Sequence, residues 1–536
     1  MAYDFVFYGG KVVDGTGRDL FEADVAIEDG VIVKIGTVTG KAKRSFNIEG
    51  HLLTPGFFDM HSHSDMRLLG DPDAETKLEQ GVTTEMVGQC GISPAPTNEA
   101  YMFGNLMENP RPWDSFTQYL KALEQLPICT NIAHHIGQGT VRIAVMGLDA
   151  SPPSSTHLRK MQDLVREALE AGAFGLSTGL IYPPGEWSAF DEIETLLGVI
   201  SEFPHAFYDS HVRGEGNGVV EAWKEGIELG KAAGVGVQIA HAKVAGRVNW
   251  GKSANCIKLV EDARQSGFDV NFDCYPYPRT GGSLKTLLPN WVKEEKGGTS
   301  NFAKRLNDPS VRERIRREIT EDTFVWNPIG YSTSGLANWD TPWILIGRIK
   351  QEKHQHMVGK YLLDIAKEHG VDPLEFLFDI LGEDDDAGVA LTLMDEADVT
   401  RFVSHPAGMI GSDGIALSHT SKADRGKPHP RNFGTFPRVL SKYVRDQRAL
   451  TIEQAVHKMT GMPAKKLALD NRGIIETEKQ ADVVVFDLID IRDRATFEDP
   501  WQRPAGIEYV VVNGCLSVEN GKFTGKTGGE VLRRRK

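Results

Sequence analysis

Two histidines separated by one residue follow an apolar run early in the chain. His61 and His63 come after the run Phe57-Phe58-Asp59-Met60, and residues i and i+2 of a β-strand point to the same side. Their imidazoles are expected to project together from the end of one strand, and imidazole is a ligand that suits zinc. The alternative is a solvated histidine pair at a strand end. The rest of the chain favours a metal, because it supplies further ligands in comparable places.

Other residues of zinc-ligand type stand at or just after the carboxyl ends of further predicted strands. In a barrel of parallel strands these ends converge on one mouth. A thiolate is a soft, anionic ligand that can bridge two metal ions, whereas the alternative for Cys90 is a small buried hydrophobic residue. The convergence predicts a metal site built from His61, His63, Cys90, His211, His241 and Asp413.

Such a site has a defined chemistry. Zinc lowers the pKa of a bound water toward about 7 and polarises a carbonyl group. Asp413 can take the proton of this water and deliver it to a leaving amine, as general base and then general acid. The alternative role of Asp413 is that of a plain ligand, and a carboxylate beside a metal can do both. The predicted reaction is metal-assisted hydrolysis of an amide.

The strands that would carry these residues alternate with helical stretches from Thr54 onward. Amphipathic spacing predicts helices at 156–169, 219–233 and 253–265. Eight strands with helices between them favour a (β/α)₈ barrel over a doubly wound open sheet. The predicted strands lie at residues 55–61, 82–88, 130–136, 173–178, 205–210, 235–241, 269–275 and 408–412.

Two regions depart from this alternating pattern. Short strands with Asp-Gly or Asn-Gly turns occur in residues 1–54 and 465–536, and we predict that together they form one small β-sandwich domain. It would sit beside a metal-dependent barrel over residues 55–464. Residues 276–405, between the seventh and eighth strands, contain helical pieces, so we predict an inserted subdomain that acts partly as a lid.

Composition restricts the partners. The chain has 536 residues, a net charge of -14 and a pI of about 5.6, which disfavours nucleic acid or an anionic membrane as a main partner. Its start lacks a signal-peptide pattern, and no stretch approaches the roughly 18 apolar residues of a membrane span. Five cysteines without a regular pattern fit a reducing cytoplasm. We expect a cytoplasmic enzyme with a small-molecule substrate, and the oligomeric state stays open.

Several motifs resemble the amidohydrolase superfamily and, in particular, the D-aminoacylase (N-acyl-D-amino-acid deacylase) family. The His-x-His element is shared across the superfamily, whereas the cysteine element and the last motif are much more specific. The terminal β segments are similar as well, so the resemblance covers nearly the whole chain. The motifs are residues 55–63, 88–91, 210–215, 241–243, 275–277, 411–414 and 429–438.

The resemblance implies roles for individual residues. It implies a tightly held zinc on Cys90, His211 and His241, and a weaker second metal position formed by His61, His63, Cys90 and Asp413. It points to Asp413 as the acid/base. It also implies that the α-carboxylate of an N-acyl-D-amino acid binds Lys243, Arg431 and one of the pair Tyr275 and Tyr277, and it leaves the choice of tyrosine open. The products would be a carboxylate and a free D-amino acid.

Two alternatives and one open question remain at this point. Cyclic amidohydrolases of the hydantoinase or dihydropyrimidinase kind use a carboxylated lysine on the fourth strand, but residues 173–179 contain no lysine. A catalytically inactive scaffold barrel should have lost several ligands, and here all six are present. On the third strand, either His134 or His135 can face the mouth, because adjacent strand residues point to opposite sides.

Overall fold

The structure is a computed structural model that describes residues 2–97, 113–293, 300–320, 341–385, 387–420 and 426–535. Its centre consists of parallel strands in two sheets, with the orders β10-β9-β8 and β11-β12-β13-β14-β15-β19. Every strand predicted from the alternating pattern has a counterpart here. The bounds are β8 (Phe57–Asp59), β9 (Val82–Val87), β10 (Asn131–His134), β11 (Ile136–Gly137), β12 (Gly175–Gly179), β13 (Phe207–His211), β14 (Gly236–Ile239), β15 (Val270–Cys274) and β19 (Gly408–Ile410).

Backbone hydrogen bonds join the two sheets at both edges. The N–H of Met60 donates to the carbonyl of Ile410 over 3.1 Å, and the N–H of Asp413 donates to the carbonyl of His61 over 2.7 Å. At the other edge only His135 separates β10 from β11, and the N–H of Phe174 donates to the carbonyl of His134 over 2.9 Å. The segments that carry His61 and Asp413 are therefore direct neighbours.

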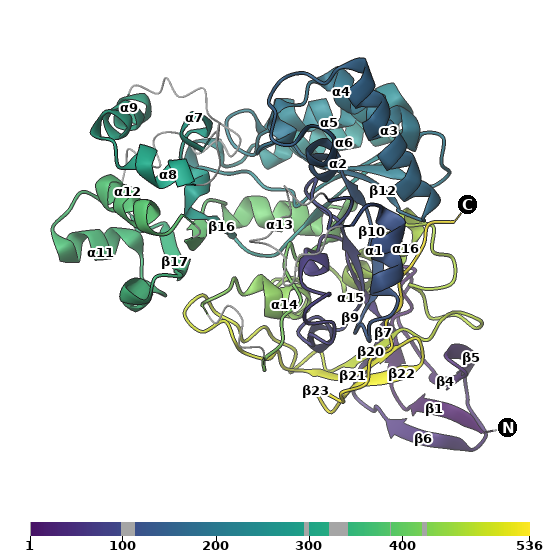
Figure 1. Cartoon of the computed structure of the whole chain (residues 1–536). Helices are drawn as coiled ribbons and strands as arrows, with labels where there is room; N and C mark the ends of the chain where they lie inside the picture. The colour runs from purple at the N-terminus through teal and green to yellow at the C-terminus, as the bar shows by residue number, and fades with distance from the viewer. Residues whose placement is uncertain are drawn as a thin grey trace.

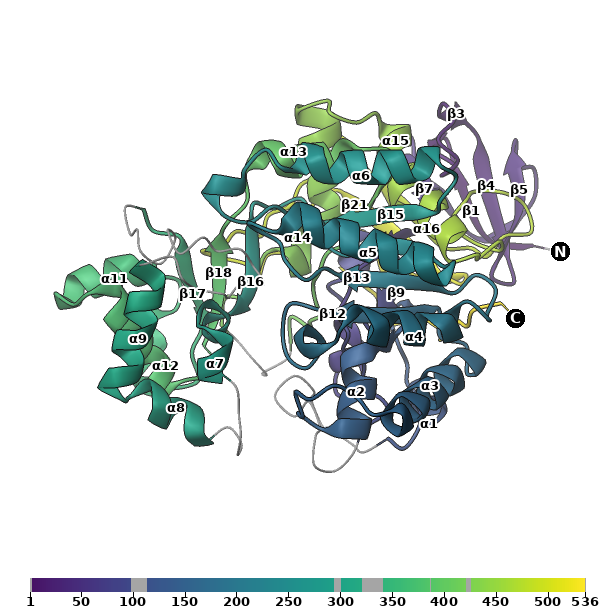
Figure 2. The ribbon, with the colours of Figure 1, turned by 90° about the horizontal axis from the view of Figure 1, so that it is seen from above.

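Helices cover the outer side of the parallel strands (Figure 2). The three helices predicted from amphipathic spacing are α3, α5 and α6. Local signals fix their ends: the Ser154 hydroxyl accepts a hydrogen bond from the N–H of His157 at the start of α3, and Gly234 ends α5 in the left-handed region. The bounds are α1 (Phe116–Leu123), α2 (Gln138–Met146), α3 (Ser155–Glu170), α4 (Phe190–Ile200), α5 (Val219–Ala233), α6 (Ser253–Gln265), α13 (Glu396–Ser404), α14 (Arg431–Arg438), α15 (Ile452–Met459) and α16 (Gly461–Lys466).

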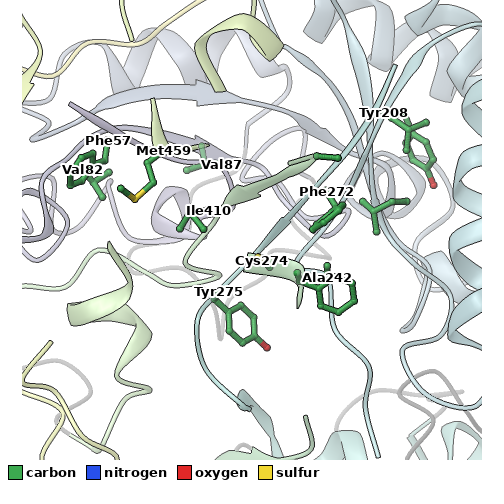
Figure 3. Close-up of a cluster of buried hydrophobic side chains, with 14 of the residues drawn as sticks. Phe57, Val82, Val87, Tyr208, Ala242, Phe272, Cys274, Tyr275, Ile410 and Met459 are labelled. Atoms are coloured by element: carbon green, nitrogen blue, oxygen red, sulfur yellow. The ribbon is translucent and has the colours of Figure 1, made fainter. Parts of the chain in front are cut away.

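A buried hydrophobic cluster fills the space between the strands and these helices. It includes Phe57 of β8, Val87 of β9 and Phe272 of β15. Figure 3 shows part of it, with Ile410 close to Cys274, its partner in the register of β19 on β15. Because interiors of this kind are close-packed, the cluster holds the adjoining strand ends rigidly in place.

The two terminal segments form two further sheets, of which the seven-stranded one combines strands from both segments and the four-stranded one contains N-terminal strands alone. One has the order β5-β4-β1-β6 and the other β23-β22-β21-β20-β7-β2-β3. The Asn-Gly signal works as expected, since Asn513 and Gly514, with φ of 48° and 77°, connect β21 to β22. The bounds are β1 (Tyr3–Tyr8), β2 (Lys11–Val12), β3 (Phe21–Glu22), β4 (Asp24–Glu28), β5 (Val31–Gly36), β6 (Ala42–Asn47), β7 (Leu52–Pro55), β20 (Val483–Phe486), β21 (Ile507–Val512), β22 (Cys515–Glu519) and β23 (Lys522–Phe523).

An insertion follows β15 and has its own hydrophobic cluster. Both views place it at one end of the central sheets and the terminal sheets at the other end (Figure 1 and Figure 2). Parts of the predicted 276–405 segment lie outside the described residues, and α13 packs on α6 and β19 instead of on this cluster. The bounds are β16 (Arg279–Ser283), α7 (Asn290–Lys293), α8 (Ser300–Leu306), α9 (Pro309–Thr320), β17 (Ile344–Arg348), α11 (Leu362–His369), α12 (Pro373–Glu383) and β18 (Gly388–Thr392).

Among the helices of the described ranges, none combines the length and the apolar character that crossing a membrane requires.

Candidate metal centre and substrate site

The six predicted ligands all lie at the carboxyl ends of the parallel strands. His211 is the last residue of β13, and the other five follow the ends of β8, β9, β14 and β19. Cys90, His241 and Asp413 have positive φ angles of 57°, 31° and 52°. Residues other than glycine adopt this backbone region uncommonly, and active sites are among the places where they do. The chain is thus held in an unfavourable conformation at three of the predicted ligands.

One group of donors surrounds the thiol of Cys90. Its Sγ lies 3.3 Å from His211 Nδ1 and 3.4 Å from His241 Nε2. A tetrahedral zinc with sulfur at about 2.3 Å and nitrogen at about 2.0–2.1 Å separates sulfur from nitrogen by roughly 3.6 Å, so both sulfur–nitrogen spacings are close to those of a zinc site. The two nitrogens, His241 Nε2 and His211 Nδ1, are 2.8 Å apart, shorter than the roughly 3.3 Å of that geometry. All three side chains are buried. We call Cys90, His211 and His241 the cysteine group.

A second group of donors lies next to it. Asp413 Oδ1 is 3.2 Å from His63 Nε2 and 3.8 Å from His61 Nε2. We call His61, His63 and Asp413 the aspartate group. His61 connects the two groups, because its Nε2 is also 3.3 Å from Cys90 Sγ. The structure therefore brings all six predicted ligands together.

Charged neighbours set the protonation of both groups. Burial alone raises the pKa of Cys90, but the rings of His61, His241 and His211 hold it well below its usual value, which favours the thiolate. Burial also raises the pKa of Asp413, but the Arg431 guanidinium, whose Nη1 donates to Oδ2 over 2.8 Å, and the ring of His63 hold it well below its usual range. Each group thus presents an anionic donor.

Lys243 contacts the cysteine group through one of its histidines. Its Nζ is 2.6 Å from His241 Nδ1 and donates to Glu215 Oε1 over 2.8 Å. Glu215 Oε1 is also 3.5 Å from His211 Nε2. Burial alone raises the pKa of Glu215, but Lys243 and the two histidines lower it below its usual value. Sequence reasoning gave Glu215 no role, and its only signal was its position four residues after His211 in the quoted motif.

The geometry separates the two candidate tyrosines. The centre of the Tyr275 ring is 5.6 Å from Lys243 Nζ and 5.1 Å from Arg431 Cζ. Figure 3 shows Tyr275 just beyond Cys274 at the end of β15. The Tyr277 ring instead contacts Arg438, whose Cζ lies 4.8 Å from the ring centre. Lys243, Tyr275 and Arg431 therefore form one cationic patch, and Tyr277 lies outside it.

The two histidines of the third strand have other surroundings. His134 Nδ1 lies 2.6 Å from the carbonyl of His135, and its Nε2 lies 3.3 Å from Asp65. His135 packs edge-on against Phe207, and burial lowers its pKa well below the usual value. Among the described residues, neither histidine belongs to a cluster of potential metal ligands.

A buried lysine connects the segments that carry the aspartate group. Lys77 is completely buried, and its Nζ donates to Asp59 Oδ2 over 2.6 Å and to the Ser412 hydroxyl over 2.8 Å. Asp59 Oδ1 in turn accepts from the backbone N–H of Ser412 over 2.7 Å and of His61 over 3.3 Å. Sequence reasoning missed Lys77, which belongs to none of the motifs.

Comparison with known proteins places this site in context. The profile described as "Amidohydrolase family" matches residues 45–194 and 347–518. N-acyl-D-glutamate deacylase of Alcaligenes xylosoxydans xylosoxydans is 34% identical over 99% of this chain and 96% of its own length.

Solved structures extend the likeness to the fold. N-acyl-D-glutamate deacylase from Bordetella bronchiseptica, complexed with zinc and a phosphonate inhibitor, superposes with a TM-score of 0.83 at 32% identity, covering 99% of this chain and 100% of that one. D-aminoacylase, studied for its binuclear metal centre, gives 0.82 at 34% identity, with the same coverage of both chains. D-hydantoinase gives 0.55 at 14% identity over 99% of both chains, a likeness of fold alone.

These findings confirm the resemblance inferred from the motifs. They also confirm the α/β fold and the membership of a zinc-binding, hydrolytic family. Full-length identity above 30% to deacylases agrees with a profile match that includes the segments of His61, Cys90 and Asp413. The chain belongs to the amidohydrolase family.

Proposed function

We propose that the protein is a zinc-dependent hydrolase that cleaves the amide of N-acyl-D-amino acids into a carboxylate and a free D-amino acid. One observation carries the proposal: a cysteine–histidine donor set, a buried aspartate and a pair of cations around Tyr275 lie together at one set of strand ends. Full-length similarity to named deacylases of this substrate class supports it.

Within this proposal, the cysteine group holds zinc tightly, and the aspartate group together with Cys90 forms a weaker second metal position. Bound zinc lowers the pKa of water toward about 7 and polarises a carbonyl group. Asp413 is ionised at neutral pH, so it can accept a proton from the attacking water. It then gives this proton to the amide nitrogen as the C–N bond breaks and the water oxygen stays on the acyl carbon.

The cationic patch recognises the α-carboxylate of the substrate. Arg431 offers a planar fork that matches a carboxylate, and Lys243 adds a point charge. Glu215 fixes the lysine and Asp413 fixes the arginine before substrate arrives. We assign the tyrosine of the site to Tyr275, because its ring is close to both cations.

We also infer that the two parallel sheets close into the (β/α)₈ barrel that the strand pattern predicts. Backbone hydrogen bonds at both junctions support this inference. The proposed domains are a β-sandwich of residues 1–54 and 465–536, a barrel of 55–464, and an inserted subdomain of 276–405 that acts partly as a lid. A cytoplasmic location stays a prediction.

A cyclic-amide substrate is the alternative that the site supports less well. Its hydrolases need a lysine on the fourth barrel strand, and β12 contains Ser177 and Thr178 but no lysine. Cys90 supplies the anionic donor in its place.

The test is amine release from N-acetyl amino acids in D and L forms by zinc-loaded enzyme. The panel includes acidic, apolar and aromatic side chains, with hydantoins as a separate set. We expect turnover of D forms only. Turnover of hydantoins without turnover of any N-acetyl-D-amino acid would contradict the proposal.

A further inference from the structure

His429 begins the motif 429–438, and the proposed chemistry gives this residue no role. Both nitrogens of its ring have partners: Nδ1 accepts a hydrogen bond from the backbone N–H of Arg431 over 3.0 Å, and Nε2 lies 3.0 Å from the carbonyl oxygen of Arg279. A backbone N–H only donates and a carbonyl only accepts, so Nε2 carries the hydrogen and Nδ1 the free lone pair. The two contacts together require one neutral form of the ring.

The surroundings of His429 favour this neutral form. Burial and the guanidinium of Arg431 lower the pKa of His429 well below its usual value. The ring packs edge-on against Phe497 and Tyr277, with ring centres 4.8 Å and 5.3 Å away. Contacts with two aromatic rings restrict its rotation, so each nitrogen keeps its partner.

The two partners of His429 belong to different parts of the molecule. Arg431 is the first residue of α14, and the N–H groups of a first helical turn find no partner within the helix. Pro430, which precedes it, has no side-chain acceptor, so His429 supplies one. Arg279 is the first residue of β16 in the insertion. His429 therefore joins the start of α14 to the insertion.

A second contact joins the same two regions. The backbone N–H of Lys427 donates to the carbonyl of Gly347 in β17 over 2.7 Å. β16 itself passes close to the cationic patch, because a Cβ added to Gly281 would lie 3.6 Å from Arg431 Nη2 and 3.7 Å from His429 Cβ. The position of the insertion thus sets the space beside the guanidinium.

The other end of α14 is fixed to the central strands. The ring of Phe436 stacks on that of Phe57 in β8, with ring centres 5.9 Å apart and an interplanar angle of 12°. At the start of the helix, Arg431 Nη1 donates to Asp413 Oδ2 over 2.8 Å. The hydrophobic core holds one end of α14, and His429 holds the end that carries the arginine. A displacement of about 1 Å in a binding group can cost about 100-fold in rate, so this second attachment is important.

We propose that His429 is a positioning residue that couples the insertion to Arg431 and so holds the guanidinium where the α-carboxylate of the substrate binds. The inference rests on the proposed function and adds to it a residue that acts through Arg431. It also gives the insertion a part in substrate binding, because the backbone at Arg279 supplies one of the two contacts of His429.

The experiment compares one N-acetyl-D-amino acid with its α-carboxamide, which lacks the charge that Arg431 recognises. His429→Ala should lower the acid-to-amide ratio of kcat/KM at least about tenfold, mainly through a higher KM for the acid. The measurement uses zinc-loaded enzyme, and zinc content and thermal stability are recorded for each variant. A general loss of stability would affect both substrates equally and leave the ratio unchanged.

Two further substitutions separate the two contacts. His429→Asn keeps an acceptor near the position of Nδ1, and His429→Gln keeps a donor near the position of Nε2. Each variant should recover only part of the ratio, because each restores one contact. Full recovery in either variant would show that one contact is sufficient and would overturn the coupling.

Arg431→Met tests whether His429 acts through the arginine. In that background, His429→Ala should cause no further change in the ratio, since the effects of coupled residues are not additive. His457→Ala is the matched control. His457 is half-buried like His429, and its Nδ1 lies 2.8 Å from the carbonyl of Gly15, so its loss should leave the ratio unchanged.

An unchanged ratio in His429→Ala, or an additive loss in the Arg431→Met background, would overturn the inference while leaving the deacylase function in place. If His429→Ala does not fold, the other two variants decide: a partial loss in each supports the coupling, and the wild-type ratio in either overturns it. Absence of turnover for every N-acyl-D-amino acid by the wild-type enzyme would overturn the proposed function and the inference together.

Discussion

The cysteine group and the aspartate group use similar donors in different surroundings. Cys90, His211 and His241 are all buried, and Glu215 and Lys243 pack behind the two histidines. In the aspartate group, the side chain of His63 remains 22% exposed, and the carboxylate of Asp413 is already paired with Arg431. All three members of the first group are buried, whereas the second group has one partly exposed member, His63.

This difference has an energetic consequence. A guanidinium 2.8 Å from Asp413 offsets part of the negative charge that a metal cation would otherwise meet there. Among the described residues, the thiolate of Cys90 has three imidazole rings within hydrogen-bonding distance and no guanidinium. The cysteine group is therefore suited to holding a metal ion and the aspartate group to transferring a proton, although both consist of residues that can act as metal ligands.

The largest expected effect comes from the cysteine group. Cys90→Ala removes the anionic donor, so the purified protein should lose its zinc on dialysis and kcat should fall by about 10³-fold, since metal activation is worth several kcal/mol. Zinc per chain and kcat are the measurements. Cys256→Ala, at a buried cysteine on α6 away from the site, is the matched control and should keep both. Full zinc content in Cys90→Ala would contradict the assignment.

Asp413→Asn should separate the two groups. We expect kcat to fall by about 10²–10⁴-fold, because the general acid and base is lost, while the zinc of the cysteine group stays bound. Asp493→Asn is the control, because Asp493 forms a similar ion pair with Arg438 at 2.9 Å outside both groups. Loss of zinc from Asp413→Asn, or a kcat equal to that of wild type, would show that the two groups are not distinct.

Lys77→Met tests whether the aspartate group depends on its buried support. The change leaves Asp59 without its cation and should weaken second-metal binding or reduce kcat by about 10–100-fold, as loss of supporting residues does at metal sites. Lys458→Met removes another buried lysine, which bonds to the carbonyl of His405, and should affect thermal stability alone. Lys77→Arg should recover part of the loss. A purely thermal effect of Lys77→Met would refute a positioning role.

The smallest effect is expected at the tyrosines. Tyr275→Phe removes a hydroxyl from the cationic patch and should raise KM by about 5–10-fold, the net value of one ordinary hydrogen bond. Tyr277→Phe serves as its control and should change KM by less than twofold (about 0.4 kcal/mol, within the usual range for neutral substitutions). Steady-state kinetics on one N-acetyl-D-amino acid measure both. A larger rise in KM for Tyr277→Phe than for Tyr275→Phe would indicate that Tyr277, and not Tyr275, contacts the carboxylate.

Sequence reasoning succeeded where the signal is local. His61, Cys90, His211 and Asp413 stand at or just past strand ends, so the strand pattern alone indicates that they converge. The third strand was predicted as continuous over 130–136, but the structure interrupts it at His135. The alternation of side chains along a strand does not indicate where the strand is interrupted.

The remaining site residues depend on contacts that the sequence does not encode locally. Lys77 and Ser412 are 335 residues apart, and a lysine reads as a surface charge until its burial is known. The choice between Tyr275 and Tyr277 likewise depends on contacts between residues that are far apart in the sequence. The two tyrosines are two residues apart in the sequence, and the positions of Arg431 and Arg438 distinguish them.

The most direct test of the comparison is the X-ray absorption spectrum of the enzyme loaded with one equivalent of zinc. We predict a sulfur neighbour at about 2.3 Å together with nitrogen neighbours at about 2.0–2.1 Å, because the tight metal lies in the cysteine group. A shell of nitrogen and oxygen alone would place the tight metal in the aspartate group and contradict the account.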